Sequence, residues 1–302
     1  MRVLAPGGTG LIGRALTASL VSDGHEVCVL SRGSRQGVPV GFGVRVTRWD
    51  GVSPAGWEAE VASSDVIVNL AGAGLADARW TAERKRLISD SRVRAGEAIV
   101  EAIRIAERRP TVLIQASGAG FYGPHGDEVV TEESPAGSDF LARVCVEWEA
   151  SSAGVEELGV RRAIVRSGLV LSRDGGALPQ MALPYRLFGG GPVGSGRQYV
   201  PWIHIDDEVA AIRFLIEHAE ARGPFNLAAP EAVTNREFGA ELGRVLGRPN
   251  VVPKPAFAMR LVLGEMATML LTGQRVAPVR LQQAGFQFRY PTLAEALRAI
   301  YG

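Results

Sequence analysis

The sequence predicts an α/β protein with a doubly wound parallel sheet and a smaller mixed lobe toward the C-terminus. Short β-branched runs alternate with longer helix-like segments through roughly the first 170 residues, as in repeated strand–helix–strand units. Apolar runs at residues 66–68 and 112–114 are continuous, which is typical of parallel strands covered by helices on both faces. After Gly168 the alternation stops and glycine-rich loops follow, so a second lobe is expected to begin there.

The elements are expected in a regular order. Runs rich in β-branched residues predict strands, and apolar residues at helical intervals predict helices. Strands are expected at residues 2–5, 26–30, 44–48, 66–70, 112–116 and 161–166, with helices at 11–22, 81–107 and 140–158. Later helices are expected at 209–218, 235–246 and 292–300, with a short strand at 225–227. The resulting division is a first domain at 1–167, onto which 198–229 folds back, and a smaller lobe at 168–197 and 230–302.

Composition excludes several classes of function. The chain has 302 residues, of which 46% are hydrophobic and 22% charged, as in an ordinary globular protein. Its formal net charge is +1, so no overall field attracts nucleic acid or an anionic membrane. The longest apolar stretch, residues 257–271, is interrupted by Arg260 and Glu265 and is too short to cross a bilayer.

The cytoplasm is the expected compartment. Residues 1–5 run directly into a glycine loop and leave no room for the apolar core of a signal peptide. Cys28 and Cys145 lie in apolar patterns, away from any spacing typical of a zinc site or a disulfide framework. We therefore expect two reduced core thiols and no metal site.

A glycine loop near the start of the chain predicts a dinucleotide site. Gly7, Gly10 and Gly13 lie between the first expected strand and an amphipathic helix, where a phosphate needs close backbone approach and unpaired N–H donors. The spacing differs by one residue from the usual dehydrogenase pattern, and the alternative is a plain flexible turn. The order strand, loop, helix favours a Rossmann domain. The expected pyrophosphate-binding residues are Gly7, Gly8, Thr9, Gly10, Leu11, Ile12 and Gly13.

The residues after the second strand favour NADP(H) over NAD(H). NAD sites place an acid here for the ribose 2′-hydroxyl, whereas this chain has Ser31 and Arg32, with Arg35 close behind. A guanidinium can chelate a 2′-phosphate that a carboxylate would repel. The alternative is that Arg32 and Arg35 are solvated loop charges. Asp50, after the third strand, is expected to accept a hydrogen bond from the adenine amino group or to be a simple turn residue.

Several segments together resemble the extended short-chain dehydrogenase/reductases. They are the glycine loop, the tetrad Asn69-Leu70-Ala71-Gly72, the stretch from Ser117 to Tyr122-Gly123, residues 202–207 and residues 225–227. A closer resemblance is to atypical members called NADP-binding epimerase-family proteins, also labelled nucleoside-diphosphate-sugar epimerases. Its marks are Arg79-Trp80-Thr81, Asp90-Ser91-Arg92, Trp148-Glu149, residues 174–178, residues 194–198 and residues 285–288. The resemblance covers nearly the whole chain.

The superfamily's usual Tyr-x-x-x-Lys pair is absent. The chain has two lysines, Lys85 and Lys254, and neither has a tyrosine four residues before it. Aligned on Glu149, the pair falls on Leu141 and Cys145. Ionising an unassisted tyrosine of pKa near 10 at pH 7 costs roughly 4 kcal/mol, so a reductase without the pair needs another acid or works slowly.

The resemblance implies candidate residues for chemistry and binding. Tyr122, helped by Ser117, is the best remaining proton donor, the alternative being a core or cleft-lining aromatic. The cofactor wall is expected at Leu70, Ala71, Gly72 and Ser117. The residues expected to contact substrate are Trp80, Tyr122, Arg186 and Arg197, with Arg275 as a further basic residue. Trp80 has a plainer reading as an exposed helix start.

His204, with Asp206 and Asp207 nearby, is expected to support the cleft rather than to act as a base. The two acids are expected to cap a helix that starts near Glu208.

Two functions are consistent with the sequence. The first is an NADP(H)-dependent oxidoreductase or epimerase acting on a small polar substrate, which could be anionic or resemble a nucleotide sugar. The second is a catalytically weak or inactive NADP(H)-binding sensor that acts through a protein partner. Nucleic acid and membrane are not expected partners. The sequence leaves open whether the chain is a monomer or, as many superfamily members are, a homodimer built through two long helices.

Overall fold

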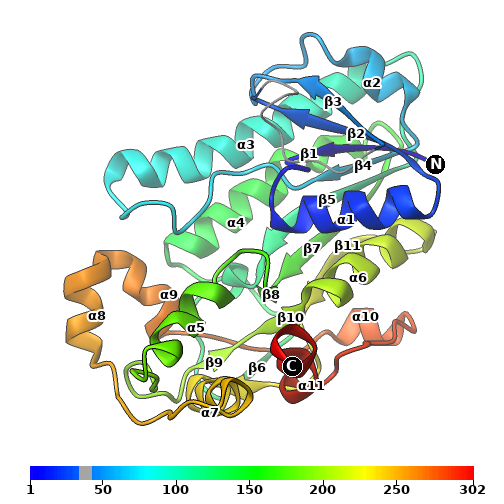
Figure 1. Cartoon of the computed structure of the whole chain (residues 1–302). Coiled ribbons are helices and arrows are strands. Elements are labelled where there is room, and N and C mark those ends of the chain that lie inside the picture. Colours follow the sequence, from blue (N-terminus) through cyan, green and yellow to red (C-terminus); the bar gives the residue numbers. More distant parts are fainter. Residues whose placement is uncertain (34–42) are drawn as a thin grey trace.

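A seven-stranded parallel sheet forms the centre of the protein in the computed structural model, which describes residues 1–33 and 43–302 (Figure 1). The strand order is β11-β7-β5-β4-β1-β2-β3, and every neighbouring pair is parallel. The strands are β1 (Arg2–Pro6), β2 (Glu26–Ser31), β3 (Val44–Arg48), β4 (Val66–Asn69), β5 (Val112–Gly118), β7 (Arg161–Ser167) and β11 (Gly223–Leu227). The order reverses between β1 and β4, where doubly wound sheets place their ligands.

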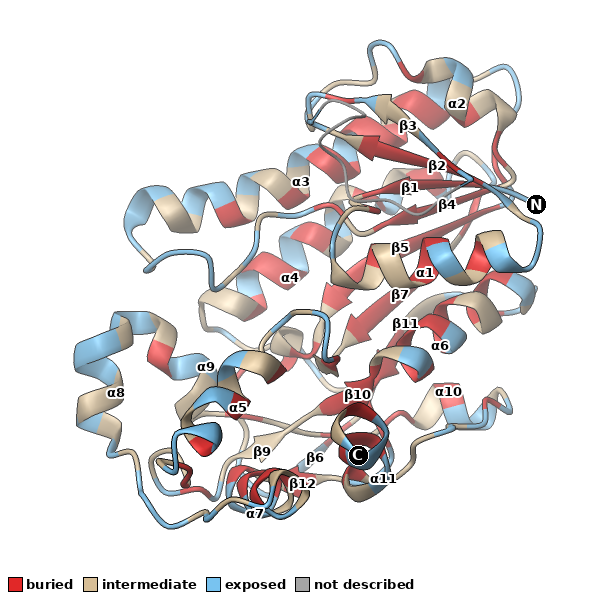
Figure 2. Cartoon of the chain, in the orientation of Figure 1, coloured by how far each residue is buried: buried red, intermediate tan, exposed pale blue. Residues whose placement is uncertain are grey.

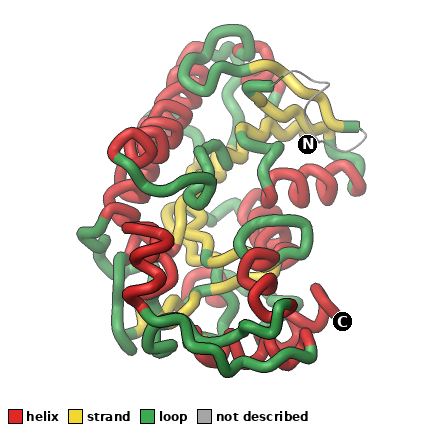
Figure 3. The backbone as a smooth tube through the Cα atoms, turned by 60° about the vertical axis from the view of Figure 1, so that its left-hand side comes forward, coloured by secondary structure: helices red, strands yellow, loops and turns green. Residues whose placement is uncertain are grey.

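Helices cover both faces of this sheet (Figures 1 and 3). On one face lie α1 (Leu11–Ser22) and α6 (Ile205–Glu217), which pack Leu16, Leu20, Ile212 and Leu215 into one buried cluster. On the other face lie α2 (Glu58–Ser63), α3 (Ala82–Ile105) and α4 (Phe140–Ser151). The strands between them are the most continuously buried part of the chain (Figure 2), as the unbroken apolar runs predicted.

A smaller lobe lies below the sheet in Figure 1. Its core joins α5 (Leu178–Arg186), α7 (Asn235–Leu246) and α11 (Leu293–Tyr301) around Trp202 and Phe238. Its paired strands are β8 (Leu169–Leu171) with β10 (Trp202–His204), β9 (Tyr199–Val200) with β12 (Val233–Thr234), and β6 (Val129–Val130) with β13 (Arg275–Val276). The remaining helices are α8 (Ala256–Leu263), α9 (Thr268–Leu271) and α10 (Val279–Gln283).

The predicted α/β class and parallel sheet are confirmed, and two predicted helix boundaries are wrong. The helix expected at 140–158 ends at Ser151 and is followed by a short 3-10 turn, because serines at 151 and 152 and Gly154 are poor helix formers. The helix expected at 209–218 starts earlier, at Ile205, because the His204 ring nitrogen accepts the amide of Asp206 and caps it.

The boundary between the two expected domains stays a prediction, although α6 and β11 do pack on the sheet. Cys28 and Cys145 are buried free thiols. Within residues 1–33 and 43–302, no helix is both long and apolar enough to cross a membrane. In the same residues, no cluster of three His, Cys, Asp or Glu side chains is placed to hold a metal ion.

Candidate functional site

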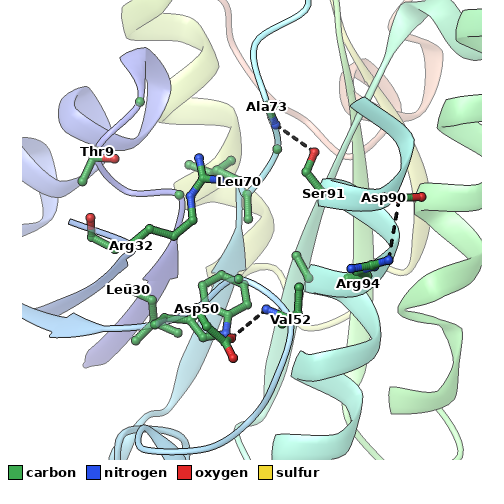
Figure 4. A pocket seen from close by; sticks show the side chains of 18 of the residues that line it. Thr9, Leu30, Arg32, Asp50, Val52, Leu70, Ala73, Asp90, Ser91 and Arg94 are labelled. Atoms are coloured by element: carbon green, nitrogen blue, oxygen red, sulfur yellow. Dashed lines mark hydrogen bonds and ion pairs between the residues drawn. The ribbon is translucent and has the colours of Figure 1, made fainter. Parts of the chain in front are cut away.

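A cleft of about 450 Å³ opens at the carboxyl ends of β1, β2 and β4, on the reversal of strand order (Figure 4). The predicted residues that line it are Gly7, Thr9, Gly10, Ser31, Arg32, Asp50, Leu70, Ala71 and Gly72. Lining residues that were not predicted include Leu30, Trp49, Val52, Ala73, Leu87, Asp90, Ser91 and Arg94. The segments at the ends of β1, β2, β3 and β4 thus bring one end of the expected cofactor site together. Residues 87–95 of α3 supply a wall that the glycine pattern could not indicate.

The glycine loop is built for close backbone contact. Gly7 has φ 79°, and a Cβ atom there would lie 2.5 Å from the backbone carbonyl carbon of Leu70. At Gly13 a Cβ atom would lie 2.5 Å from the Cα of Gly8, so this glycine lets the helix pack on its own loop. At Gly10 the nearest atom would be 3.4 Å away, and this residue borders the cleft. Gly7 and Gly13 are therefore required by the fold, whereas Gly10 keeps space open for a ligand.

The start of α1 points its amides toward this loop. Gly10 is the N-cap residue, and no side chain of the described residues caps the helix there. The Arg14 guanidinium donates to the Thr9 carbonyl at 2.9 Å and fixes the loop from outside. A helix start with no side-chain acceptor suits an anion, because both the amides and the helix dipole favour negative charge.

Arg32 extends into the cleft from the end of β2 (Figure 4). Its aliphatic stem lies on Gly51, where a Cβ atom would be 3.6 Å from the Arg32 Cδ. Ser31 also lines the cleft, and the described part of this segment contains no acid at the position typical of NAD sites. Arg35, the second predicted arginine, lies outside the described residues.

Asp50 organises a turn at the cleft's edge. Its Oδ1 accepts the amides of Val52 at 2.8 Å and Ser53 at 2.9 Å, and its Oδ2 accepts the Ser53 hydroxyl at 2.7 Å. These hydrogen bonds, that from Val52 first, hold the pKa of Asp50 below its usual value. The carboxylate is thus a turn residue, which is one of the two roles predicted for it, and it also borders the cleft.

Hydrogen bonds fix the segment that follows β4. The Asn69 side chain accepts the amide of Ala71 at 3.1 Å and donates to Gln115 at 3.0 Å, so the ends of β4 and β5 are joined inside the protein. The Ser91 hydroxyl accepts the amide of Ala73 at 3.0 Å (Figure 4). The wall formed by residues 70–73 is therefore held from the sheet and from α3.

Ser117, at the end of β5, belongs to a buried polar network. Its hydroxyl donates to Glu149 of α4 at 2.7 Å. Two nitrogens of Arg166, on the neighbouring strand β7, contact the same carboxylate at 2.9 Å each. The ion pair is nearly buried, with side-chain exposures of 5% for Arg166 and 12% for Glu149. Sequence patterns did not indicate this pairing, because its members lie on three separate elements.

Tyr122 has no exposed surface. Its hydroxyl donates to the Asn226 side-chain oxygen and accepts from Arg166 at 3.2 Å, while burial raises its pKa. The ring packs in a small cluster with Ala119, Val130 and Val276. The hydroxyl is therefore sealed from a substrate in this conformation, and the core-aromatic alternative describes the side chain as it stands.

Neither residue at the positions of the missing Tyr-x-x-x-Lys pair can replace the tyrosine or the lysine chemically. Leu141 lies against Gly120, and the Cys145 thiol lies 3.7 Å from the Gly118 carbonyl. Burial raises the pKa of Cys145 to about 11, so the thiol is neutral at physiological pH. No cation therefore comes from the lysine position.

None of the residues predicted to contact substrate lines the cleft. Trp80 donates from its indole to the Leu75 carbonyl and packs edge-on against Phe140, at 5.0 Å between ring centroids. Arg186 lies over the Tyr301 ring at 5.6 Å, and Arg275 over Tyr199 at 5.5 Å. Arg197 is exposed. Their roles toward a substrate stay predictions.

His204 and Asp207 have structural contacts. The His204 ring packs on Tyr290 at 4.0 Å between centroids, and burial lowers its pKa, so the ring is a neutral helix cap. Asp207 accepts the amides of Arg289 at 2.8 Å and Tyr290 at 2.9 Å. The expectation that His204 supports the cleft stays a prediction, because the printed contacts of the ring are with Tyr290 and the start of α6. Asp207 binds the segment before α11 and does not cap α6.

Family models match two parts of the chain. The model described as the NAD dependent epimerase/dehydratase family matches residues 3–228, which include the cleft and all of the central sheet except Arg2. A second model, described as a domain of unknown function, DUF1731, matches residues 254–300 in the smaller lobe.

Similar proteins match over almost the full chain. The epimerase family protein SDR39U1 homolog, chloroplastic, of Arabidopsis thaliana is 40% identical over 305 residues, covering 99% of this chain and 86% of that protein. Epimerase family protein SH2119 of Staphylococcus haemolyticus is 41% identical over 291 residues, covering 96% and 95%. Among solved structures, human epimerase family protein SDR39U1 (isoform 2) with NADPH has a TM-score of 0.88 and 36% identity, covering 100% and 99%.

Proposed function

Because this chain belongs to the NAD-dependent epimerase/dehydratase family, we propose that it binds NADP(H) in the cleft and catalyses a hydride transfer on a small polar alcohol or carbonyl compound. Membership confirms the resemblance to extended short-chain dehydrogenase/reductases. The observation that carries the cofactor assignment is Arg32, which extends into the cleft where NAD sites carry an acid. The NADPH in the human relative's crystal structure supports it.

The described residues fit the dinucleotide. The start of α1 offers amides for the pyrophosphate, and Gly10 leaves room for it. Arg32 suits a 2′-phosphate, and the wall at 70–73 leads from the cleft toward Ser117 at the end of the next strand. When bound, the cofactor supplies or accepts a hydride at the nicotinamide C4.

Ser117 is the candidate that we propose for handling the proton. Its hydroxyl donates to Glu149, so its oxygen lone pairs can accept a hydrogen bond from a substrate hydroxyl. A proton from that hydroxyl can then pass through Ser117 to the Glu149 carboxylate. Tyr122 acts behind this pair by holding Arg166, which in turn orients Glu149. The substrate that we propose is a small polar molecule. Its charge is left out of the proposal, because none of the candidate arginines lines the cleft.

A sensor that binds NADP(H) without turning it over is the second candidate. It is favoured by the neutral Leu141 and Cys145 at the positions of the catalytic pair and by the sealed Tyr122 hydroxyl. Incubation of the protein with NADPH and a panel of carbonyl compounds and nucleoside-diphosphate sugars separates the two. Oxidation of NADPH that is lost in Ser117→Ala supports the enzyme, whereas tight NADPH binding with no turnover across the panel supports the sensor.

The cofactor assignment is tested with Arg32→Ala. We expect wild-type protein to bind NADPH more tightly than NADH, and the variant to lose about tenfold or more in NADPH affinity with little change for NADH, because only the 2′-phosphate contact is removed. Affinities are measured by calorimetric titration. Arg104→Ala, an exposed arginine at the far end of α3, is the control for a change of net charge and should leave both affinities unchanged. Equal wild-type affinity for the two cofactors rules the assignment out.

A further inference from the structure

Arg92 of α3 is a buried guanidinium with no carboxylate partner among the described residues. It is 8% exposed, and its Nη1 donates to the carbonyls of Ile88 at 2.9 Å and Ala73 at 3.0 Å. Its Cζ lies 4.8 Å from the centroid of the Trp148 ring. Burial lowers its pKa to about 10, so the group is still charged at neutral pH. Nε and Nη2 take part in no hydrogen bond within the described chain and are not sealed from solvent.

Arg92 lies between the cleft and the end of β5. A Cβ atom at Gly72, which lines the cleft, would be 3.0 Å from the Arg92 Cζ, so the guanidinium lies directly against Gly72. Its Cζ also lies over the ring of Trp148, which follows Cys145 by three residues on α4. The Cys145 thiol in turn contacts Gly118, the residue after Ser117. The guanidinium thus lies between Gly72, after β4, and α4, the helix that carries Cys145 and Glu149.

A second buried arginine shows what a purely structural role looks like here. Arg161 is also 8% exposed, but both of its terminal nitrogens donate to carbonyls, those of Leu215, Ile216 and Ala221 near the end of α6. Arg161 therefore uses its donors on the protein. Arg92 leaves Nε and Nη2 without a partner among the described residues, so both can donate to a ligand.

We propose that Arg92 donates hydrogen bonds to oxygens of the nicotinamide half of bound NADP(H). It would thereby replace the positive charge of the family's catalytic lysine, whose position Cys145 occupies in this chain. The ligand chemistry is that of ribose hydroxyls and the carboxamide oxygen, which accept from a guanidinium. Arg92 is a positioning residue, since it holds the reacting ring and exchanges no proton. This inference rests on the proposed binding of NADP(H).

The test compares the binding of two ligands that share the adenosine half of the dinucleotide. NADPH contains both halves of the dinucleotide, whereas adenosine 2′,5′-bisphosphate contains only the half that Arg32 is proposed to contact. Arg92→Met keeps the apolar stem of the side chain, and Arg92→Lys keeps a charge. We expect Arg92→Met to bind NADPH about tenfold more weakly and the bisphosphate unchanged, because one hydrogen bond from a charged group is lost. Arg92→Lys should recover part of the loss, and Arg32→Ala should weaken both ligands.

Fluorescence of the bound reduced nicotinamide gives a second readout, which is expected to differ between wild type and Arg92→Met at saturation. Arg161→Met is the control for loss of a buried arginine, and it should lower the melting temperature without changing the ratio of the two affinities. An unchanged ratio in Arg92→Met, with or without a lower melting temperature, overturns the inference and leaves Arg92 structural. Failure of wild-type protein to bind NADPH overturns the proposed function instead.

Discussion

At the residue scale, burial against the sheet changes the protonation of one carboxyl group, that of Glu208. Glu208 of α6 has no exposed surface; one oxygen accepts the Ser167 hydroxyl at 2.6 Å, and the other has no hydrogen-bond partner among the described residues. Burial raises the pKa of this carboxyl to about 8. The group is therefore protonated at neutral pH in the folded protein.

This carboxyl makes stability depend on pH. Its pKa is higher in the folded protein, about 8, than the ordinary value of 4.5, so unfolding releases a proton between these values. Its contribution is full below pH 4.5 and is lost as pH rises toward 8, by up to about 1.4 kcal/mol per pH unit. We expect Glu208→Gln to remove that slope in urea unfolding at pH 5 to 8. Glu217→Gln, at the exposed end of the same helix, is the control, and equal slopes in Glu208→Gln and wild type would contradict the assignment.

Whether a residue could be placed from the sequence depended on how far apart in the chain its contacts lie. Arg32 and the loop glycines could be placed because a local pattern, strand then loop then helix, fixes where their backbone lies. Glu149 with Arg166, and Arg92 behind Gly72, could not be placed, because their contacts join elements that lie far apart in the sequence. Tyr122 could be put at the correct end of β5, but its burial depends on Asn226 and the later lobe.

At the element scale, the glycines of the loop before α1 meet two different requirements. Gly7 is needed for the backbone conformation, and Gly10 leaves space for a ligand. Gly7 needs a positive φ and lies against the backbone at Leu70, whereas Gly10 has φ −73°, which any residue adopts. We expect Gly7→Ala to lower the free energy of unfolding by about 1–3 kcal/mol. Gly10→Ala should cost less than about 1 kcal/mol in stability but weaken NADPH binding, because its methyl group enters the cleft.

Thermal denaturation and NADPH titration of both variants measure this separation. A Gly10→Ala protein that binds NADPH like wild type would show that the pyrophosphate does not approach this side of the loop. A stable Gly7→Ala protein would show that the loop can move away from Leu70.

Some helices, as well as some helix boundaries, escaped prediction. The α5 helix was not predicted, because prolines at 179 and 184 are usually helix breakers. Here Pro179 lies in the first turn, where its missing N–H costs little. The α6 start was placed too late because the capping group is an imidazole, which lacks the usual Ser, Thr, Asp or Asn signal. In contrast, α7 was predicted with its observed bounds, and Thr234 and Glu237 form a capping box at its start.

At the scale of the whole molecule, Asp207 connects the sheet's covering helix to the segment before α11. It is 1% exposed and accepts two consecutive amides, those of Arg289 and Tyr290. We expect Asp207→Asn to lower the free energy of unfolding by about 1–3 kcal/mol, because an amide group replaces one acceptor with a donor that faces an N–H. Urea denaturation measures the change, and limited proteolysis should cut the C-terminal segment faster.

Asp206→Asn is the matched control for that substitution. Its carboxylate is half exposed and lies 3.6 Å from the Arg289 guanidinium, so we expect a change within about 0.5 kcal/mol. Equal effects of the two substitutions would mean that the backbone contacts of Asp207 do not hold the segment.

The strand order has a consequence for synthesis of the chain on the ribosome. β11, at the edge of the sheet, pairs with β7 but is made more than 50 residues after it, and Phe225 and Leu227 complete the buried face. Until residue 227 has left the exit tunnel, a nascent chain exposes the open edge of β7, where other chains can pair. Translation speed through this stretch, and chaperones that shield the edge, should therefore influence the yield of native protein more than they would for a sheet closed by its first strands.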